Sequence, residues 1–149
     1  MRWTRPETWH LTLLFVGSVE PRRAPELEAL LRHVADVTSA FDVKVDRGGG
    51  RLRRGEGVAW LGLSTGAGSL IEAAVATAAA CPPDITDGPP PKRTPSPHLT
   101  LVRRADARVL EDLRTQRHGP LGVAWRVDRL ALVRSHLEAG GARYETLVE

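Results

Sequence analysis

The tetrapeptide His-Leu-Thr-Leu occurs twice in this chain of 149 residues, beginning at His10 and again at His98. In a β-strand, alternate side chains share a face, so a strand that opens with His10 presents this imidazole together with the Thr12 hydroxyl. A second strand presents His98 with Thr100 in the same way. The leucines between them turn to the opposite face, which suits a hydrophobic core. The repeat therefore predicts two strands that each offer one imidazole and one hydroxyl on the same side.

These groups together could hydrolyse a phosphodiester. One imidazole can deprotonate water and the other can protonate a departing ribose oxygen, because the unperturbed pKa of histidine, about 6.5, suits both tasks. Each threonine hydroxyl can donate a hydrogen bond to a phosphate oxygen, where negative charge grows in the transition state. Neither tetrapeptide has the cluster of close ligands that zinc or non-haem iron requires. We therefore expect a site with no metal and no cofactor.

The rest of the chain predicts helices and further strands that would position the two tetrapeptides. Apolar spacing and composition favour helices over residues 25–37, 69–80 and 105–117. Alternation favours strands over residues 9–16, 41–46, 58–63, 98–102, 122–134 and 143–148, with the glycine-rich residues 48–57 as a loop inside a hairpin. This order of elements predicts an α+β fold of two lobes with related topology.

Composition limits the class of protein. The length fits a single domain, residues 1–149, in which residues 82–97, with seven prolines, connect the two lobes. The one cysteine, Cys81, excludes an intramolecular disulfide and a zinc site of the multi-cysteine kind. The apolar stretches are too short to span a membrane, and the N-terminal residues lack the apolar region of a signal peptide. We therefore expect a cytoplasmic protein without a membrane partner.

Charge is compatible with a polyanionic partner but does not identify one. The formal net charge is +3, and the isoelectric point is near 9.7. Arg47, Arg51, Arg53 and Arg54 lie close together and could contact RNA phosphates, although a charged segment is often only solvated. The sequence leaves both interpretations open.

The aromatic residues fall into two groups by their surroundings in the sequence. Trp60 and Trp125 lie in apolar strand patterns, so we expect them in the core. Trp3, Trp9 and Tyr144 remain candidates for stacking on an exposed base.

The segments around the two tetrapeptides carry a resemblance to a known family. They read Pro-Glu-Thr-Trp-His-Leu-Thr-Leu-Leu-Phe-Val-Gly at residues 6–17 and Pro-His-Leu-Thr-Leu-Val-Arg at residues 97–103, and residues 140–144 read Gly-Gly-Ala-Arg-Tyr. The sequence resembles the 2H phosphoesterases, which are defined by two His-x-Thr-x motifs on the two lobes of a pseudo-symmetric fold. The match is close to the bacterial RNA 2′,3′-cyclic phosphodiesterases, historically called 2′-5′ RNA ligases, and extends over nearly the whole chain.

The resemblance implies a fold, an activity and roles for particular residues. The implied fold is a duplicated α+β fold with antiparallel sheets, outer helices and a central groove. The implied activity is hydrolysis of a 2′,3′-cyclic phosphate at an RNA end to a 2′-phosphomonoester, with His10 as proton donor and His98 as proton acceptor. It also implies that Thr12, Thr100 and Arg103 contact the phosphate. Strict alternation would turn Arg103 away from His98, so we expect a bulge or bend between them.

The sequence departs from the family pattern at two places. Family members usually have a strand and a helix before the first motif, whereas His10 follows Met1 by nine residues. We therefore expect a sheet without these elements, whose open edge could pair with a second copy of the chain. The glycine-rich and arginine-rich residues 48–54 replace the aromatic-proline turn that is common in the family, so the grip on the substrate there is expected to differ.

The motifs leave three functions open. The leading hypothesis is a phosphodiesterase whose partner is an RNA with a 2′,3′-cyclic phosphate end. A second is an enzyme of the same family that acts on a small cyclic nucleotide or on a 2′-5′ linkage, including its ligation. A third is an RNA-binding module without turnover.

Overall fold

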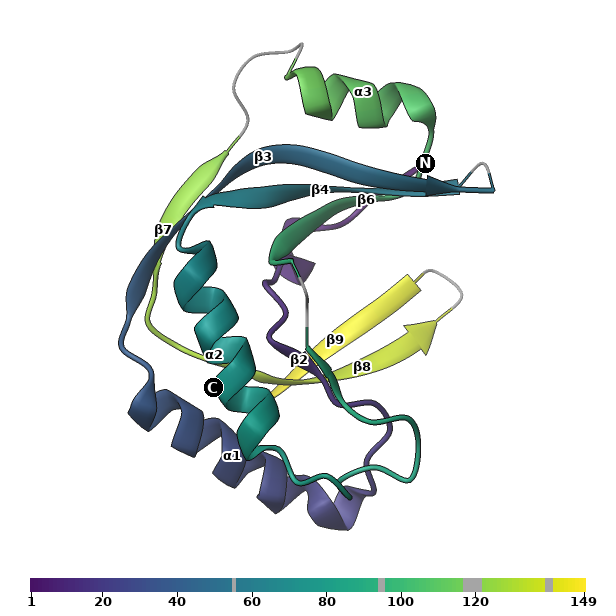
Figure 1. Cartoon of the computed structure of the whole chain (residues 1–149). Helices are drawn as coiled ribbons and strands as arrows, with labels where there is room; N and C mark the ends of the chain where they lie inside the picture. Colours follow the sequence, from purple (N-terminus) through teal and green to yellow (C-terminus); the bar gives the residue numbers. More distant parts are fainter. Residues whose placement is uncertain (55, 94–95, 117–121, 139–140) are drawn as a thin grey trace. The chain divides into compact units, whose positions relative to one another are not determined.

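The structure is a computed structural model that describes residues 1–54, 56–93, 96–116, 122–138 and 141–149. The chain divides into two compact units, each assembled from three separate segments (Figure 1). The first unit comprises Met1–Leu11, Asp42–Ala67 and Ser96–Arg126, and the second comprises Thr12–Phe41, Gly68–Pro95 and Val127–Glu149.

A twisted sheet forms the body of the first unit. Among the described residues it has five strands in the order β1-β6-β4-β3-β7, and the pairs β1–β6, β6–β4 and β4–β3 are antiparallel. The strands are β1 (Arg2–Trp3), β3 (Phe41–Arg53), β4 (Glu56–Thr65), β6 (His98–Ala105) and β7 (Val123–Val127). The predicted hairpin is therefore confirmed as β3–β4, and the second histidine tetrapeptide opens β6 as predicted.

Helix α3 (Ala107–Thr115) covers one face of this sheet (Figure 1). The Asp106 carboxylate caps the helix by accepting a hydrogen bond of 3.0 Å from the Val109 backbone N–H. Leu110 and Leu113 are buried beneath the helix. Because burial of one leucine side chain contributes roughly 1.5–3 kcal/mol, these two residues hold α3 against the sheet.

The glycine-rich residues that were predicted as a loop belong to β3, which continues without interruption to Arg53. A Cβ atom on Gly48 would lie 1.8 Å from the Leu113 carbonyl oxygen, and one on Gly50 would lie 2.1 Å from Leu110 Cδ2. Glycine is required there because the α3 backbone lies directly on the strand. The prediction was right in placing the turn of the hairpin within residues 48–57, since Arg54 lies in a turn between β3 and β4. It was wrong for residues 48–53, because it assigned to turn formation a composition that serves close packing.

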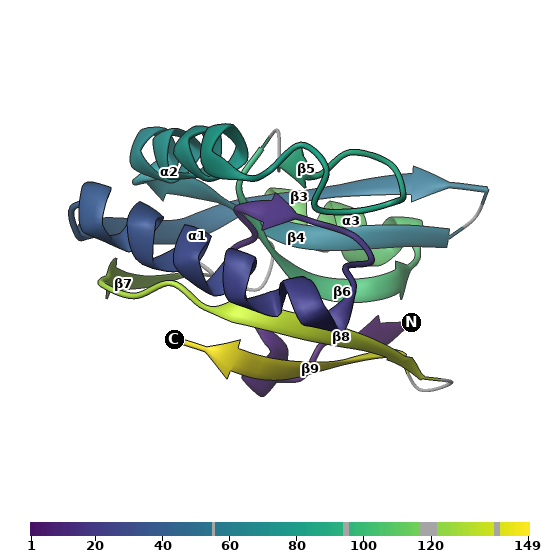
Figure 2. The same cartoon turned by 90° about the horizontal axis from the view of Figure 1, so that it is seen from below.

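The second unit contains α1 (Ala24–Val37), α2 (Ala67–Ala80) and two short antiparallel pairs of strands. These pairs are β2 (Leu14–Phe15) with β5 (Lys92–Arg93), and β8 (Leu132–Glu138) with β9 (Gly141–Val148). Helix α1 packs against β8 (Figure 2). Its buried Leu30 and Val34 form a core with Cys81 and Ile85, which follow α2. Burial raises the pKa of the Cys81 thiol.

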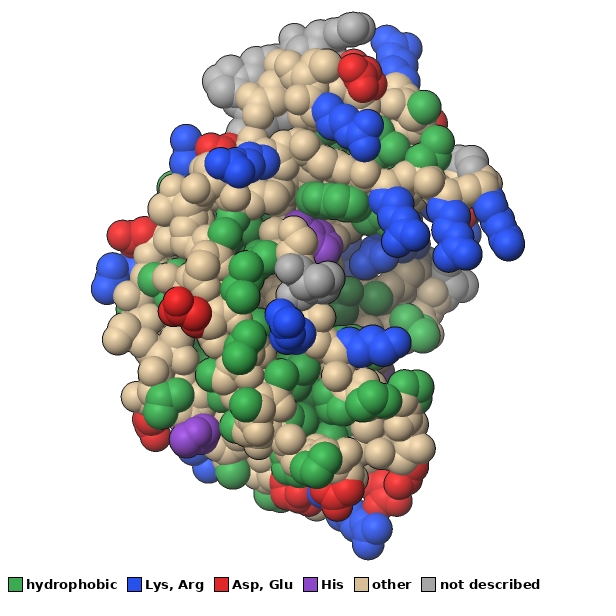
Figure 3. Space-filling view, viewed as in Figure 1, with side chains coloured by type: hydrophobic (Ala, Val, Ile, Leu, Met, Phe, Trp, Pro, Cys, Tyr) green, Lys and Arg blue, Asp and Glu red, His purple; other side chains and the backbone are tan. Residues whose placement is uncertain are grey.

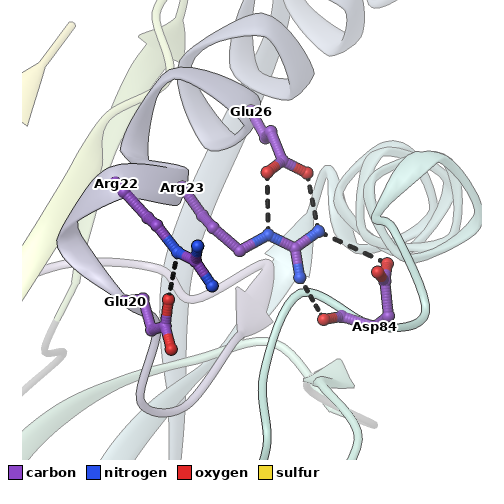
Figure 4. A network of polar contacts seen from close by, with 5 residues as sticks. All are labelled: Glu20, Arg22, Arg23, Glu26 and Asp84. Carbon is purple, nitrogen blue, oxygen red and sulfur yellow. Dashed lines mark hydrogen bonds and ion pairs between the residues drawn. The ribbon is translucent and has the colours of Figure 1, made fainter.

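An ion-pair network fixes the start of α1 to the segment that follows α2 (Figure 4). Arg23 donates two hydrogen bonds of 2.7 Å to the Glu26 carboxylate, a bidentate geometry. It also donates to the Asp84 backbone carbonyl and, at 3.3 Å, to the Asp84 carboxylate. The hydrogen bond from Arg23 holds the pKa of Glu26 below its usual value. A neighbouring ion pair joins Arg22 to Glu20.

The predicted helices over residues 25–37 and 69–80 are confirmed as α1 and α2, but two predicted strands were wrong. The expected strand 9–16 is reduced to Leu14–Phe15, and the expected strand 122–134 divides into β7 and β8, which belong to different units. The end expected for the helix 105–117 lies outside the described residues. No helix in the described part of the chain is long and apolar enough to cross a membrane.

Candidate active site

Strand β6 carries three of the five residues that the sequence predicted for the site. His98 is paired across the sheet with Gly62, and Thr100 is paired with Trp60 of β4. Both side chains are half-buried, and they lie on the face opposite to α3, since Leu99 between them is buried with Leu61 on the helix side. The second motif therefore presents its imidazole and its hydroxyl together, as predicted.

A β-bulge in β6 brings Arg103 to the same face. Thr100 pairs with Trp60 and Val102 pairs with Ala59, so Leu101 is an extra residue opposite two consecutive residues of β4. Because of this extra residue, the side chains after Leu101 change the face of the sheet on which they lie. Arg103 then pairs with Val58, which lies on the same face as Trp60. The bulge expected between His98 and Arg103 is thus confirmed.

Trp60 contacts the ring of His98. Their ring centroids lie 5.3 Å apart with an interplanar angle of 46°. The indole covers Gly49, where a Cβ atom would lie 2.7 Å from Trp60 Nε1. The prediction that Trp60 and Trp125 lie in the core was wrong: Trp60 is half-buried on the face of the histidine, and Trp125 is 38% exposed.

Each motif histidine makes the same hydrogen bond to its own backbone. His98 Nδ1 lies 2.8 Å from the Ser96 carbonyl oxygen, and His10 Nδ1 lies 2.8 Å from the Thr8 carbonyl oxygen. A carbonyl oxygen only accepts, so Nδ1 carries the proton in both rings. The Nε2 atom of each ring is then the one that accepts a proton when the ring is neutral and donates it when the ring is charged. Both copies of the motif therefore select the same tautomer.

The segment that carries His10 is anchored to β6 although it is not a strand. Thr4 Oγ1 donates to the carbonyl oxygens of Thr100 and Leu101 at 2.9 Å each, and the Thr4 N–H donates to Leu101 at 2.8 Å. Trp9 Nε1 donates to Thr4 Oγ1 at 3.0 Å, after the short 3₁₀ turn Pro6–Thr8. These bonds tie the residue before His10 to the backbone of Thr100.

Thr12 belongs to the second unit, whereas His10, His98, Thr100 and Arg103 belong to the first. Its side chain is half-buried and lies outside regular secondary structure. The expectation that a strand presents His10 and Thr12 on one face was wrong, because residues 9–13 are not extended in a sheet ladder.

Two residues near the motifs were missed by sequence reasoning. Thr4 was not considered because its role depends on a bond to a strand 96 positions away. Arg2 was not considered because its pairing with Arg103, across β1 and β6, depends on a strand far away in the sequence. The edge-strand dimer remains a prediction. No group of three or more histidine, cysteine or acidic residues placed to hold a metal ion occurs in the described residues.

The family model of the 2'-5' RNA ligase superfamily matches residues 5–139, most of the chain. The chain belongs to this superfamily. The match includes both His-Leu-Thr-Leu tetrapeptides and Arg103, and it confirms the resemblance to the 2H phosphoesterases.

Several solved structures have the same fold as the chain. Escherichia coli LigT complexed with 3'-AMP is 26% identical, with 99% of this chain and 78% of that chain covered and a TM-score of 0.70. LigT in apo form is 25% identical over 99% of this chain and 77% of that chain, with a TM-score of 0.73. TT0787 of Thermus thermophilus is 24% identical over 99% of this chain and 79% of that chain, with a TM-score of 0.72. No curated protein sequence matches the chain. These likenesses confirm the predicted α+β fold.

Proposed function

We propose that this superfamily member hydrolyses the 2′,3′-cyclic phosphate at an RNA end to a 2′-phosphomonoester, without a metal ion. The observation that carries the proposal is the matched pair of histidines in one compact unit, each with Nδ1 bonded to a backbone carbonyl. A reaction that needs one proton acceptor and one proton donor can use two imidazoles, and in each of these rings the hydrogen bond at Nδ1 leaves Nε2 as the nitrogen that exchanges a proton.

The proposed reaction assigns one proton transfer to each ring. His98 Nε2 accepts a proton from water as the water oxygen forms a bond to phosphorus. The bond between phosphorus and the ribose 3′-oxygen breaks, and His10 Nε2 donates a proton to that oxygen. The phosphate stays on the 2′-oxygen. After the reaction, His98 is protonated and His10 is neutral. Proton exchange with solvent then restores the starting state of both rings.

Thr100, Arg103 and Thr12 are proposed to bind the phosphate. The Thr100 hydroxyl and the Arg103 guanidinium share the sheet face of His98, so they can donate hydrogen bonds to the non-bridging oxygens. Thr12 is the equivalent of Thr100 in the first motif. The complex of E. coli LigT with 3'-AMP supports a ligand of this kind, because that ligand is a nucleotide with a phosphate on the ribose.

The experiment is a product analysis in the presence of EDTA. Purified protein is incubated with an oligoribonucleotide that ends in a 2′,3′-cyclic phosphate, and the product is examined by ³¹P NMR and by its resistance to a phosphatase specific for 3′-ends. We expect a 2′-phosphomonoester at an unchanged rate after chelation. A 3′-phosphate product would contradict the proposed leaving group, and loss of the rate that returns with a divalent ion would contradict the metal-free mechanism.

Two controls separate this function from its alternatives. The variants His10→Ala and His98→Ala should bind the same oligonucleotide but convert it about 10²–10⁴-fold more slowly. Binding by wild-type protein with no turnover would favour an RNA-binding module, and joining of the cyclic end to a 5′-hydroxyl strand would favour ligation through a 2′-5′ linkage.

A further inference from the structure

The sheet face that carries His98 and Thr100 continues across β4 onto β3, where it becomes rich in arginine. Arg103 of β6 pairs with Val58 of β4, and Val58 pairs in turn with Arg51 of β3. On the other side, Arg103 pairs with Arg2 of β1. Directly paired residues lie on the same face, so one row across four strands reads Arg2, Arg103, Val58 and Arg51.

Arg53 extends this arginine row toward the hairpin end. It lies two residues beyond Arg51 on β3, and alternation therefore places both side chains on the same face. Lys and Arg side chains gather over the hairpin end of β3 and β4 (Figure 3). One acidic residue, Glu56, is paired with Arg53, and it offsets only part of the positive charge.

Neither Arg51 nor Arg53 stabilises the fold through a polar contact with another described residue. Both are exposed, and neither makes an ion pair or a side-chain hydrogen bond within the part of the chain that the structure describes.

We propose that Arg51 and Arg53 bind the phosphates of nucleotides upstream of the terminal one, so that an oligonucleotide is a better substrate than a cyclic mononucleotide. This inference rests on the proposed function and names its substrate class. Neighbouring strands lie about 4.8 Å apart, so Arg51 lies roughly 10 Å from Arg103 across the sheet. At this separation, Arg103 binds the terminal phosphate while Arg51 and Arg53 bind other phosphates of the same strand.

Arg108 provides a matched control on the other face of the sheet. It lies on α3, its side chain is 89% exposed, and its nearest acidic partner is Asp112 at 4.0 Å. Replacement of Arg108 by alanine removes one positive charge from the same unit without touching the arginine row.

The experiment compares two substrates under steady-state conditions. One is 2′,3′-cyclic AMP, and the other is an octaribonucleotide with a 2′,3′-cyclic phosphate end. We expect the double variant Arg51→Ala/Arg53→Ala to lose about tenfold in kcat/KM on the octamer, mainly through KM, because two charge-assisted contacts disappear. Its rate on 2′,3′-cyclic AMP should match wild type. The slope of log KM against log salt for the octamer should become shallower by about 1.4, which is about 0.7 for each lost phosphate contact.

The control variants have defined expectations. Arg51→Lys/Arg53→Lys keeps both charges and should retain most of the octamer rate, and Arg108→Ala should behave as wild type. An unchanged octamer rate in the alanine double variant would overturn the inference, as would an equal loss on both substrates. If wild-type protein converts neither substrate, the proposed function fails. In that case, fluorescence anisotropy with a 2′-phosphorylated octamer tests separately whether Arg51 and Arg53 bind upstream phosphates. Equal affinity of the double variant and wild type for this octamer would overturn the inference.

Discussion

Replacement of Gly48 by alanine should destabilise the first unit through a backbone clash. The new Cβ atom would lie 1.8 Å from the Leu113 carbonyl oxygen and 2.5 Å from its carbonyl carbon, whereas ordinary contacts begin near 3.4 Å. The contact atoms belong to the α3 backbone, so no side-chain rotation relieves the overlap. Helix α3 must therefore move away from the strand and lose packing at Leu110 and Leu113. Overpacking of this kind costs about 1–3 kcal/mol, and we expect the upper end of this range.

Urea denaturation followed by far-ultraviolet circular dichroism would measure this cost. Gly62→Ala is the matched control, because it lies in the same sheet and its new Cβ atom would meet nothing closer than 3.6 Å. Gly50→Ala should fall between the two, since its main clash, at 2.1 Å, is with the movable side chain of Leu110. If Gly48→Ala and Gly62→Ala unfold at the same urea concentration, the glycines do not serve helix packing and the reasoning is refuted.

Four further outcomes are expected. His10→Ala and His98→Ala should each lower the hydrolysis rate by about 10²–10⁴-fold without unfolding the protein, so a near-wild-type rate in either would exclude the two-histidine mechanism. Thr100→Val keeps the strand shape but deletes the hydroxyl, and a smaller loss of kcat is expected in the same assay. The profile of kcat/KM against pH should be bell-shaped, because one ring must be neutral and the other protonated; a flat profile would argue against it. Because Arg23 lowers the pKa of Glu26, this carboxylate stabilises the fold above its usual pKa, and the stabilisation is lost as pH falls through the lowered value; melting curves of Glu26→Gln should lack this loss.

The two identical tetrapeptides show how far sequence patterns could predict the site. The second copy is a strand because β6 has neighbours on both sides, which satisfy its backbone groups. The first copy has the same residues but begins in a segment that side-chain bonds from Thr4 and Trp9 hold in place. Periodicity reports which side chains could share a face, but it does not report whether a partner strand is present.

The arginines and glycines of β3 were harder to predict than the helices. Helices α1 and α2 follow from local spacing and composition, which the sequence displays directly. The role of Gly48 depends on α3, which comes much later in the chain and contacts it only in the folded state. The face shared by Arg51 and Arg103 depends on two strand registers and on the bulge at Leu101. The sequence could predict the bulge only because the family pattern demanded it.

Each motif histidine is oriented by a hydrogen bond to the backbone carbonyl two residues before it, so its orientation does not depend on a side chain from another part of the fold. Many histidines are oriented by a carboxylate from a distant part of the fold. Such an orientation is lost if either the histidine or the acidic residue is substituted. Here the orienting group is the peptide backbone, which no substitution at Thr8 or Ser96 removes. A gene segment that encodes one such motif therefore carries the orientation of its ring with it when it is copied. An imidazole held in this way can act as the acid or as the base, so two copies of one motif can supply both groups.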